Sequence, residues 1–341
     1  MKLLVLGGTG FLGYHVVAEA LEAGHEVSTF TRKGEAPLTG AEPLAGDRQG
    51  DLGALEGREW DAVLDTFSDP EAVGETAGLL SGSVGAYGFV SGITNYHPDG
   101  PAVVDESSPL RREVSGEDEE DPLQERGLAK IRCERVVKEK FDGPALIART
   151  GIMVGPRDPT DRFSWWPERF TRVGDRGGEI LAPGDPEREV QFTDARDLAR
   201  WMVRMLDAKT PGVFNTVGPG RGVSVGRVLD SCRRVAEEAV GAAVGGSEVV
   251  WVGEQFLRER LSGVPEEERP LWFPEDQIPF EAVDSSKALA AGLSFRPVEE
   301  TARDTLNWLR RRPQGQELLA GLSPEFEREL LRGWREQLPA R

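Results

Sequence analysis

The sequence predicts an α/β fold, in which a doubly wound parallel sheet is joined by a smaller, interleaved C-terminal domain. Short apolar or β-branched runs alternate with helical stretches through the first half of the chain, as in a parallel sheet covered by helices on both faces. Runs such as "LLVL" do not alternate between apolar and polar residues, which is typical of strands buried on both sides. A glycine-rich turn, "GGTGFLG", joins the first expected strand to the first expected helix.

The expected elements follow this alternation along the chain. The first strand is expected at 2–8, a helix closed by Gly24 at 11–24, and a second strand at 25–32. Four further strands and one helix complete the expected sheet domain: strands at 60–68, 86–94, 144–156 and 212–218, and the helix at 193–206.

After residue 156 the pattern becomes irregular and richer in Trp, Pro and charged residues. We therefore expect one domain at 1–156, with 190–218 contributing to it, and a second at 157–341 that holds most of the remaining chain and the C-terminal helices. Ser323 as N-cap and Pro324 at the first helical position predict the last helix. Its apolar stripe is expected to pack on the protein itself: Phe326, Leu330, Trp334 and Leu338.

The composition argues against several classes of function. A chain of 341 residues is long enough for about two domains with a substantial core, and it has no apolar run near the roughly 20 residues of a membrane span. The N-terminal apolar run meets glycines too soon for a signal peptide, so we expect a cytoplasmic protein. A net charge of −18 argues against nucleic acid as a partner, because phosphate binding needs clustered Lys and Arg. Two cysteines and three histidines form no ligand cluster, and no metal is expected.

The glycine-rich turn predicts a Rossmann-like dinucleotide site. Gly7, Gly10 and Gly13 are spaced G-x-x-G-x-x-G, and the same segment also satisfies G-x-G-x-x-G from Gly8. Such glycines allow a tight turn, a close approach of the backbone to a pyrophosphate and close packing of helix on strand. The free N–H groups of the first helical turn then face the negative charge. The residues expected to hold the cofactor here are Gly7, Thr9, Gly10, Phe11, Leu12 and Gly13.

The end of the second strand favours NADP over NAD, although NAD stays an alternative. An acidic residue at this position binds the 2′-hydroxyl of the adenosine ribose, whereas arginine accommodates a 2′-phosphate. The strand ends "STFTRKG", with Arg32 and Lys33 at its tip and the nearest acid, Glu35, beyond it. The other interpretation is that Arg32 is a solvated loop charge.

These segments together resemble the extended short-chain dehydrogenase/reductase family, which includes the NAD-dependent epimerase/dehydratase group, along nearly the whole chain. "LVLGGTGFLG" is similar to the first strand and glycine turn of the family, and "GDRQGDL" to its adenine-side segment. "DAVLDTFS" and "YGFVSGITNY" resemble its fourth and fifth strands. "RGLAKIRCE" resembles its Y-G-x-x-K-x-x-x-E helix, "ARTGIMVGP" its sixth strand and nicotinamide-side loop, and "FTDARDLA" a later helix start.

The resemblance implies further cofactor contacts. Asp47 and the backbone after it would touch the adenine, and Lys130 would hold the nicotinamide ribose. The other residues implied to bind the cofactor are Arg48, Thr66, Phe67, Ser91 and Ile152.

The resemblance breaks at the catalytic residues. In the family, a tyrosine four residues before the lysine carries the proton, the lysine lowers the pKa of that tyrosine, and a Ser or Thr binds the substrate oxygen. Here the tyrosine position is Arg126. The Ser/Thr position, four residues before Tyr96, is Gly92, although Ser91 and Thr94 flank it. No Tyr-x-x-x-Lys occurs anywhere in the sequence.

Arg126 has two interpretations. A guanidinium stays charged and cannot donate a catalytic proton, but it can bind a carboxylate or a developing oxyanion. Alternatively, it is a solvated charge that pairs with Glu119 or Glu120. If a proton carrier is needed, histidine suits the task best, because its charge changes near neutral pH. The candidates on the same side of the sheet are His97, Thr94, Tyr96, Glu125 and Asp65.

The expected substrate side also departs from the sugar-nucleotide branch of the family. In that branch an arginine lies seven residues before the Asp that corresponds to Asp197, and here that position is Val190, with Arg188 two positions away. "RDPTDRFSWW" supplies Arg157, Trp165 and Trp166, with Arg162 between them. This set suits an anionic or aromatic small molecule, and core tryptophans are the alternative.

Three functions stay open. The first is an NADP(H)-dependent oxidoreductase or epimerase that acts on a small metabolite with an altered acid/base set, with a homodimer as a further expectation. The second is a non-redox isomerase, lyase or cyclase on the same scaffold. The third is a non-catalytic dinucleotide sensor. The first is favoured by the resemblance, not by visible catalytic residues.

Overall fold

The computed structural model describes residues 1–113, 122–173, 178–218, 223–241, 247–272, 281–313 and 315–337. It divides into two compact units. Unit 1 comprises Met1–Met153, Gln191–Gly220 and Pro279–Phe295, and unit 2 comprises Val154–Val190, Arg221–Ile278 and Arg296–Arg341. The segment 281–295 was expected in the second domain, but it joins unit 1 because β13 (Ala282–Val283) pairs with β6 (Val103–Val104).

The core of unit 1 is a parallel sheet of seven strands, which confirms the predicted fold class. The strand order is β11-β7-β5-β4-β1-β2-β3. The chain adds β2 and β3 on one side of β1 and then β4 and the later strands on the other side, so the strand order reverses between β1 and β4. In a doubly wound sheet, ligands bind outside the carboxyl ends of the strands at such a switch point. The strands are β1 (Lys2–Leu6), β2 (Glu26–Thr31), β3 (Ala41–Ala45), β4 (Ala62–Asp65), β5 (Tyr87–Gly92), β7 (Ala145–Thr150) and β11 (Gly212–Asn215).

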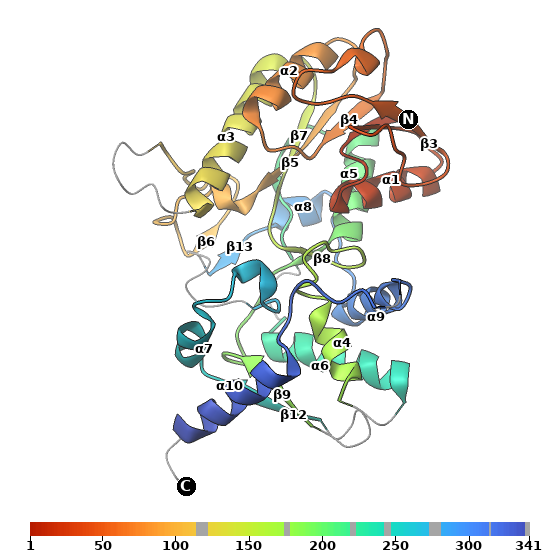
Figure 1. Cartoon of the computed structure of the whole chain (residues 1–341). Helices are drawn as coiled ribbons and strands as arrows, with labels where there is room; N and C mark the ends of the chain where they lie inside the picture. The colour runs from red at the N-terminus through yellow and green to blue at the C-terminus, as the bar shows by residue number, and fades with distance from the viewer. Residues whose placement is uncertain are drawn as a thin grey trace. The chain divides into compact units, whose positions relative to one another are not determined.

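Helices cover both faces of this sheet (Figure 1). On one face lie α1 (Phe11–Glu22) and α5 (Ala195–Asp207), and on the other lie α2 (Pro70–Leu80) and α3 (Pro122–Lys140). Successive side chains of β1 enter different cores: Leu3 packs with the α1/α5 side and Leu4 with the α2/α3 side. This two-sided burial explains why the strand is apolar without interruption.

Side-chain caps stabilise the N-termini of α2 and α5, two helices of unit 1. The Asp69 carboxylate caps α2 by accepting a hydrogen bond from Ala72 N at 2.9 Å, and Pro70 occupies the first helical position. Asp194 caps α5 in the same way through Arg196 N. Both are the side-chain caps that helix N-termini favour.

Smaller elements complete unit 1: 3-10 turns η1 (Gly53–Leu55) and η2 (Ile93–Asn95), the strand β10 (Thr193–Asp194) and the helix α8 (Ser286–Ala290). The short strand β8 (Met153–Val154) lies where the chain passes from unit 1 to unit 2.

Unit 2 contains the parallel strands β9 (Gly178–Pro183) and β12 (Ser247–Val252) with their own helices. The predicted last helix is α10 (Pro324–Gln337), and Ser323 Oγ accepts from Phe326 N at 3.2 Å. Its Leu330 is buried and Trp334 packs on the Phe256 ring, while Leu338 lies outside the described residues. The other elements are α4 (Trp165–Thr171), α6 (Val225–Val240), α7 (Glu254–Leu261), η4 (Glu266–Glu268) and α9 (Val298–Leu309). Among the described helices, none is long and apolar enough to span a bilayer.

Candidate functional site

The glycine turn between β1 and α1 has the backbone geometry that the sequence predicts. Gly7 has a φ of 91°, a left-handed conformation that favours glycine. A Cβ on Gly13 would lie 2.2 Å from the Gly7 carbonyl oxygen, so α1 can pack this closely only with glycine there. The N-cap residue Gly10 supplies no side-chain cap, and the first N–H groups of α1 therefore keep the donors that an anion binds. Thr9 is exposed, whereas Phe11 is half-buried and Leu12 is buried.

Arg32 and Lys33 follow β2 directly, and both side chains are exposed. The strand ends at Thr31, whose hydroxyl accepts a hydrogen bond from Glu35 N at 2.9 Å and closes the turn. The acid nearest the strand tip, Glu35, therefore lies after a closed turn, and the two residues at the tip are basic.

A second tight turn follows β3 at the edge of the sheet. The backbones of Asp47 and Asp51 exchange two hydrogen bonds of 2.9 Å, and the Asp47 carboxylate accepts from Gln49 N at 3.0 Å. This arrangement places the half-buried Asp47 beside the outward-facing backbone of the turn.

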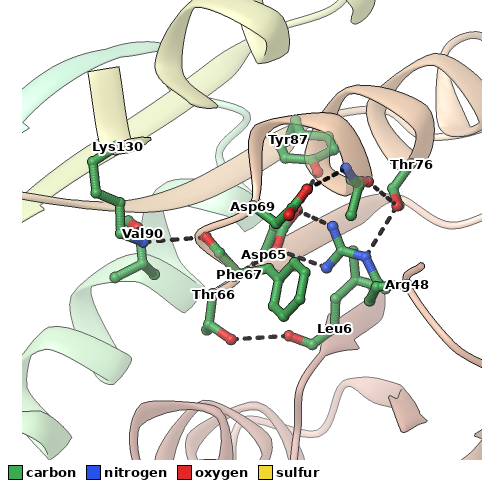
Figure 2. A network of polar contacts seen from close by, with 11 residues as sticks. Leu6, Arg48, Asp65, Thr66, Phe67, Asp69, Thr76, Tyr87, Val90 and Lys130 are labelled. Carbon is green, nitrogen blue, oxygen red and sulfur yellow. Dashed lines mark hydrogen bonds and ion pairs between the residues drawn. The ribbon is translucent and has the colours of Figure 1, made fainter. Parts of the chain in front are cut away.

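The next residue, Arg48, points inward and forms a buried ion pair with Asp65 at the end of β4 (Figure 2). Its Nη1 and Nη2 donate to the two carboxylate oxygens at 2.8 and 2.7 Å, and its Nε donates to Thr76 Oγ1 at 3.0 Å. The Tyr87 hydroxyl donates to the same carboxylate at 2.6 Å, and the guanidinium lies 5.2 Å from the centre of the Phe67 ring. The Arg48 side chain was expected to contact the cofactor, but its polar atoms are used within this cluster.

The charges of this cluster fix its protonation. Burial by itself would raise the pKa of Asp65, but the Arg48 guanidinium and the hydrogen bonds from Tyr87 and Phe67 N outweigh it and lower that pKa below its usual range. Burial and the Asp65 charge raise the pKa of Tyr87 well above its usual value. Asp65 is thus an ionised anchor and Tyr87 a neutral donor. Neither has the properties of a proton carrier near neutral pH.

Lys130 on α3 reaches the ends of two neighbouring strands (Figure 2). Its Nζ donates to the carbonyl oxygen of Phe67, which follows β4, at 3.1 Å, and to that of Val90 in β5 at 2.7 Å. It also lies 4.9 Å from the centre of the Phe89 ring. Burial lowers the pKa of Lys130, partly offset by nearby acidic groups that include Asp65.

The residue at the tyrosine position, Arg126, is exposed on the first part of α3. Its neighbour Gly127 explains how closely the helix approaches η2, because a Cβ there would lie 2.3 Å from the Thr94 carbonyl oxygen. The same carbonyl accepts from the buried Arg111 at 2.6 Å. The expected alternative partners of Arg126, Glu119 and Glu120, lie outside the described residues.

Ser91 belongs to a buried polar network that the sequence did not predict. Its hydroxyl donates to the Glu134 carboxylate at 2.6 Å, and Asn95 Nδ2 donates to the same carboxylate at 2.7 Å. Arg149 completes the network with hydrogen bonds of 3.0 and 2.8 Å to the two oxygens of Glu134. The Ser91 hydroxyl, expected to contact the cofactor, is thus bound within the protein. Glu134 is the glutamate of the quoted helix pattern, and this is the one signal for the network in the sequence.

The proton-carrier candidates differ in their environments. Tyr96 is fully buried, and its hydroxyl donates to Asn215 Oδ1 at 2.6 Å and accepts from Arg149 at 3.2 Å. Burial raises the pKa of Tyr96, and the Arg149 charge opposes this only in part. His97 keeps 37% of its side chain exposed, and its Nδ1 accepts from Asp99 N at 3.1 Å. This bond occupies Nδ1 of the ring.

Four other predicted residues of unit 1 flank these groups. Gly92 ends β5 and Thr94 lies in η2, both half-buried. Thr66 Oγ1 donates to the carbonyl oxygen of Leu6 in β1 at 3.2 Å. Ile152 is half-buried, and its carbonyl oxygen accepts from Thr193 N at 2.8 Å.

The predicted substrate tryptophans lie in the core of unit 2. Trp165 and Trp166 are 2% and 3% exposed, and their rings meet edge to face at 4.8 Å. The indole nitrogen of Trp166 donates to the Leu271 carbonyl oxygen at 2.9 Å. Their packing fits the alternative of core tryptophans.

The predicted substrate arginines of unit 2 have different surroundings. Arg157 is exposed and has a φ of 72°, a left-handed conformation rare outside glycine. Arg188 forms an ion pair with Glu254, and Arg162 forms one with Glu266 at 2.9 Å. Of the three, Arg157 is the most exposed side chain.

A family model matches the N-terminal part of the chain. Residues 3–88 match the model of the NAD dependent epimerase/dehydratase family. This segment contains the glycine turn, the β2 tip and the Arg48–Asp65–Tyr87 cluster.

Several solved structures share the fold of the chain. UDP-glucuronic acid 4-epimerase from Bacillus cereus in complex with NAD is 16% identical, with a TM-score of 0.61 and coverage of 91% of this chain and 99% of that one. The Bordetella bronchiseptica enzyme WbmH in complex with NAD+ is 16% identical, with a TM-score of 0.62 and coverage of 91% and 98%. Human epimerase family protein SDR39U1 with NADPH is 18% identical, with a TM-score of 0.56 and coverage of 90% and 99%.

The family match is confined to residues 3–88, whereas the fold similarity extends along 90–91% of the chain. The N-terminal segment of the chain is thus similar to the NAD dependent epimerase/dehydratase family, and the chain as a whole shares the fold of these solved structures.

Proposed function

We propose that the protein binds NADP(H) and acts on a small metabolite as an oxidoreductase or epimerase with a non-standard acid/base set. The observation that carries the proposal is the exposed Arg32–Lys33 pair directly after β2, beside a glycine turn with the required backbone geometry. Arginine at this position suits a 2′-phosphate, and an acidic residue would suit a 2′-hydroxyl.

Different residues of unit 1 would bind different parts of the cofactor. The N–H groups at the start of α1, after Gly10, would bind the pyrophosphate, and Arg32 would bind the 2′-phosphate. The turn at Asp47 would contact the adenine. An ammonium has three donors, and Lys130 uses two of them on carbonyl oxygens, so one stays for the nicotinamide ribose. When bound, the nicotinamide would supply or accept a hydride.

We propose His97 as the proton carrier in place of the missing tyrosine. Its half-exposed ring contrasts with the fully buried Tyr96, whose hydroxyl already has two partners. The exposed Arg126 would bind a carboxylate or stabilise negative charge on the substrate, since it cannot give up its own proton. This division of tasks favours an anionic substrate.

A specific observation also favours a non-redox isomerase, lyase or cyclase as the second candidate. The chain has Arg126 and Gly92 at the positions where the family has its tyrosine and its Ser or Thr, and ordinary ketone reduction uses both. Product analysis with a substrate, combined with absorbance at 340 nm, separates the two functions. A net oxidoreductase changes the absorbance in proportion to product, and an epimerase changes it only transiently within a turnover, because the hydride that it removes is returned. A non-redox enzyme forms product without even a transient change.

The test of the proposed cofactor is a titration of the purified protein with NADPH and with NADH, followed by tryptophan fluorescence. We expect NADPH to bind more tightly, and Arg32→Ala to weaken NADPH binding about tenfold or more, because a charge-assisted contact contributes about 1.5–3 kcal/mol. Arg135→Ala, an exposed arginine on α3, is the matched control. Equal affinity of the wild type and Arg32→Ala for NADPH would contradict the assignment of Arg32.

A further inference from the structure

Lys130 is held from three sides within the β4–β5 part of the sheet. Its Nζ donates to the Phe67 and Val90 carbonyl oxygens and lies over the Phe89 ring. A lysine that only bound a solvent-exposed ligand would not need hydrogen bonds to two backbone carbonyl oxygens. These contacts therefore indicate a structural role for Lys130, and this role does not require a tyrosine at position 126.

The peptide groups on either side of Phe67 are fixed from opposite directions. Phe67 N donates to Asp65 Oδ1 at 2.9 Å, and Phe67 O accepts from Lys130 at 3.1 Å (Figure 2). Asp65 is itself immobilised, because it is fully buried and accepts from both Arg48 and Tyr87. The segment after β4 is thus held by a buried anion at one end and a half-buried cation at the other.

This segment lies against the glycine turn. Thr66 Oγ1 donates to the Leu6 carbonyl oxygen at 3.2 Å, and a Cβ on Gly7 would lie only 2.8 Å from the same hydroxyl oxygen. A displacement of Phe67 would move its neighbour Thr66, whose hydroxyl is bonded to the carbonyl oxygen of Leu6, the residue immediately before Gly7. The position of the segment therefore affects the turn that would bind the pyrophosphate.

We infer that Lys130 is a positioning residue: through the Phe67 carbonyl, and together with Asp65, it sets the segment after β4 and thereby the pyrophosphate-binding turn. The inference rests on the proposed dinucleotide site and deepens it. It explains why the lysine stands without its tyrosine partner. A contact with the nicotinamide ribose alone would affect only the nicotinamide half of the cofactor, whereas positioning of the turn also affects the adenine half.

Fragments of the cofactor distinguish these two roles. Adenosine 2′,5′-bisphosphate and ADP are adenine halves of NADP and NAD, and both lack the nicotinamide ribose. We would titrate wild type and Lys130→Met with each fragment and with NADPH and NADH, using calorimetry. We expect Lys130→Met to weaken the fragment that matches the preferred cofactor by about three- to thirtyfold, the range of coupling through packed neighbours. Hydrogen exchange at the Phe67 amide should also accelerate in the variant.

Matched variants make the test specific. Lys138→Met makes the same change at an exposed position of α3 and should leave both affinities unchanged. Lys130→Arg keeps a charged donor and should recover at least part of the fragment affinity. If Lys130→Met does not fold, Lys130→Gln, a shorter neutral donor, takes its place with the same expected outcome.

Two results for Lys130→Met would overturn the inference and leave the proposed function intact. The first is unchanged binding of the fragments with weakened binding of NADPH, which would show that Lys130 contacts only the nicotinamide ribose. The second is unchanged binding of both the fragments and NADPH. Failure of the wild-type protein to bind any dinucleotide or fragment would instead overturn the proposed function, and the inference with it.

Discussion

Replacing Asp65 by Asn should destabilise the protein by about 3–5 kcal/mol, the cost of breaking a buried ion pair by removing one partner. The carboxylate is 0% exposed and accepts four hydrogen bonds, two from Arg48 and one each from Tyr87 and Phe67 N. The guanidinium left behind is only 9% exposed and would keep its charge without a counter-ion. The loss is therefore much larger than the 0–1 kcal/mol of a surface pair.

The assay is urea unfolding followed by circular dichroism, with Asp142→Asn as the control, since Asp142 is exposed. The double variant Arg48→Met/Asp65→Asn should recover part of the loss, because it removes the unpaired charge. A cost below about 1 kcal/mol for Asp65→Asn would refute the reasoning, as would a double variant whose cost equals the sum of the two single costs.

The pH dependence of this prediction follows from the direction of the shift. The folded protein lowers the pKa of Asp65, so the carboxylate contributes stability that is fully present above its unfolded pKa of about 3.9. This contribution is lost as the pH falls through the lower, folded pKa. The difference in unfolding free energy between wild type and Asp65→Asn should therefore be constant from pH 5 to neutrality and shrink below about pH 4.

Three further predictions concern Glu134, Gly13 and His97. Glu134→Gln should lower the unfolding free energy, measured by urea unfolding, by about 3–5 kcal/mol, because Arg149 is 3% exposed and would lose its counter-ion. The control Glu139→Gln, at an exposed position of the same helix, should lower it by less than about 0.5 kcal/mol, the range of surface substitutions. Gly13→Ala should weaken NADPH binding at least about tenfold by calorimetry, because its Cβ would meet the Gly7 carbonyl oxygen at 2.2 Å and overpacking costs about 1–3 kcal/mol; Gly78→Ala, whose Cβ has open space, should bind normally. Once a substrate is identified, His97→Gln should lower kcat by about 10²-fold or more; an unchanged kcat would exclude His97 as the proton carrier.

The fold could be predicted because its signals are local. The apolar run of β1, the glycines after it and the caps of the helices each specify conformation within a few residues, and the strand–helix alternation then specifies the parallel sheet. The sheet edge was less visible: β3, "AEPLA", contains a proline and a glutamate and mixes exposed with buried residues. Edge strands carry such residues because one side has no neighbour to bond.

The site could be predicted only in part, because position along the chain does not reveal side-chain direction. Asp47 and Arg48 are adjacent in sequence, yet only Arg48 turns inward, where Asp65 supplies the opposite charge from 17 residues away. The Glu134–Arg149 network likewise depends on the register of α3 over β5 and β7. The missing tyrosine was visible in the sequence, whereas the backbone partners of Lys130 were not, since carbonyl oxygens carry no sequence signature.

The most direct test of the proposed cofactor is the ratio of the dissociation constants of NADH and NADPH, measured by competition in wild type and in Arg32→Ala. We expect a wild-type ratio of about ten or more, which falls toward one in the variant because the contact with the 2′-phosphate is lost. A wild-type ratio of one or less, or no binding of either dinucleotide, would contradict the proposal that this glycine turn and the basic β2 tip form an NADP(H) site.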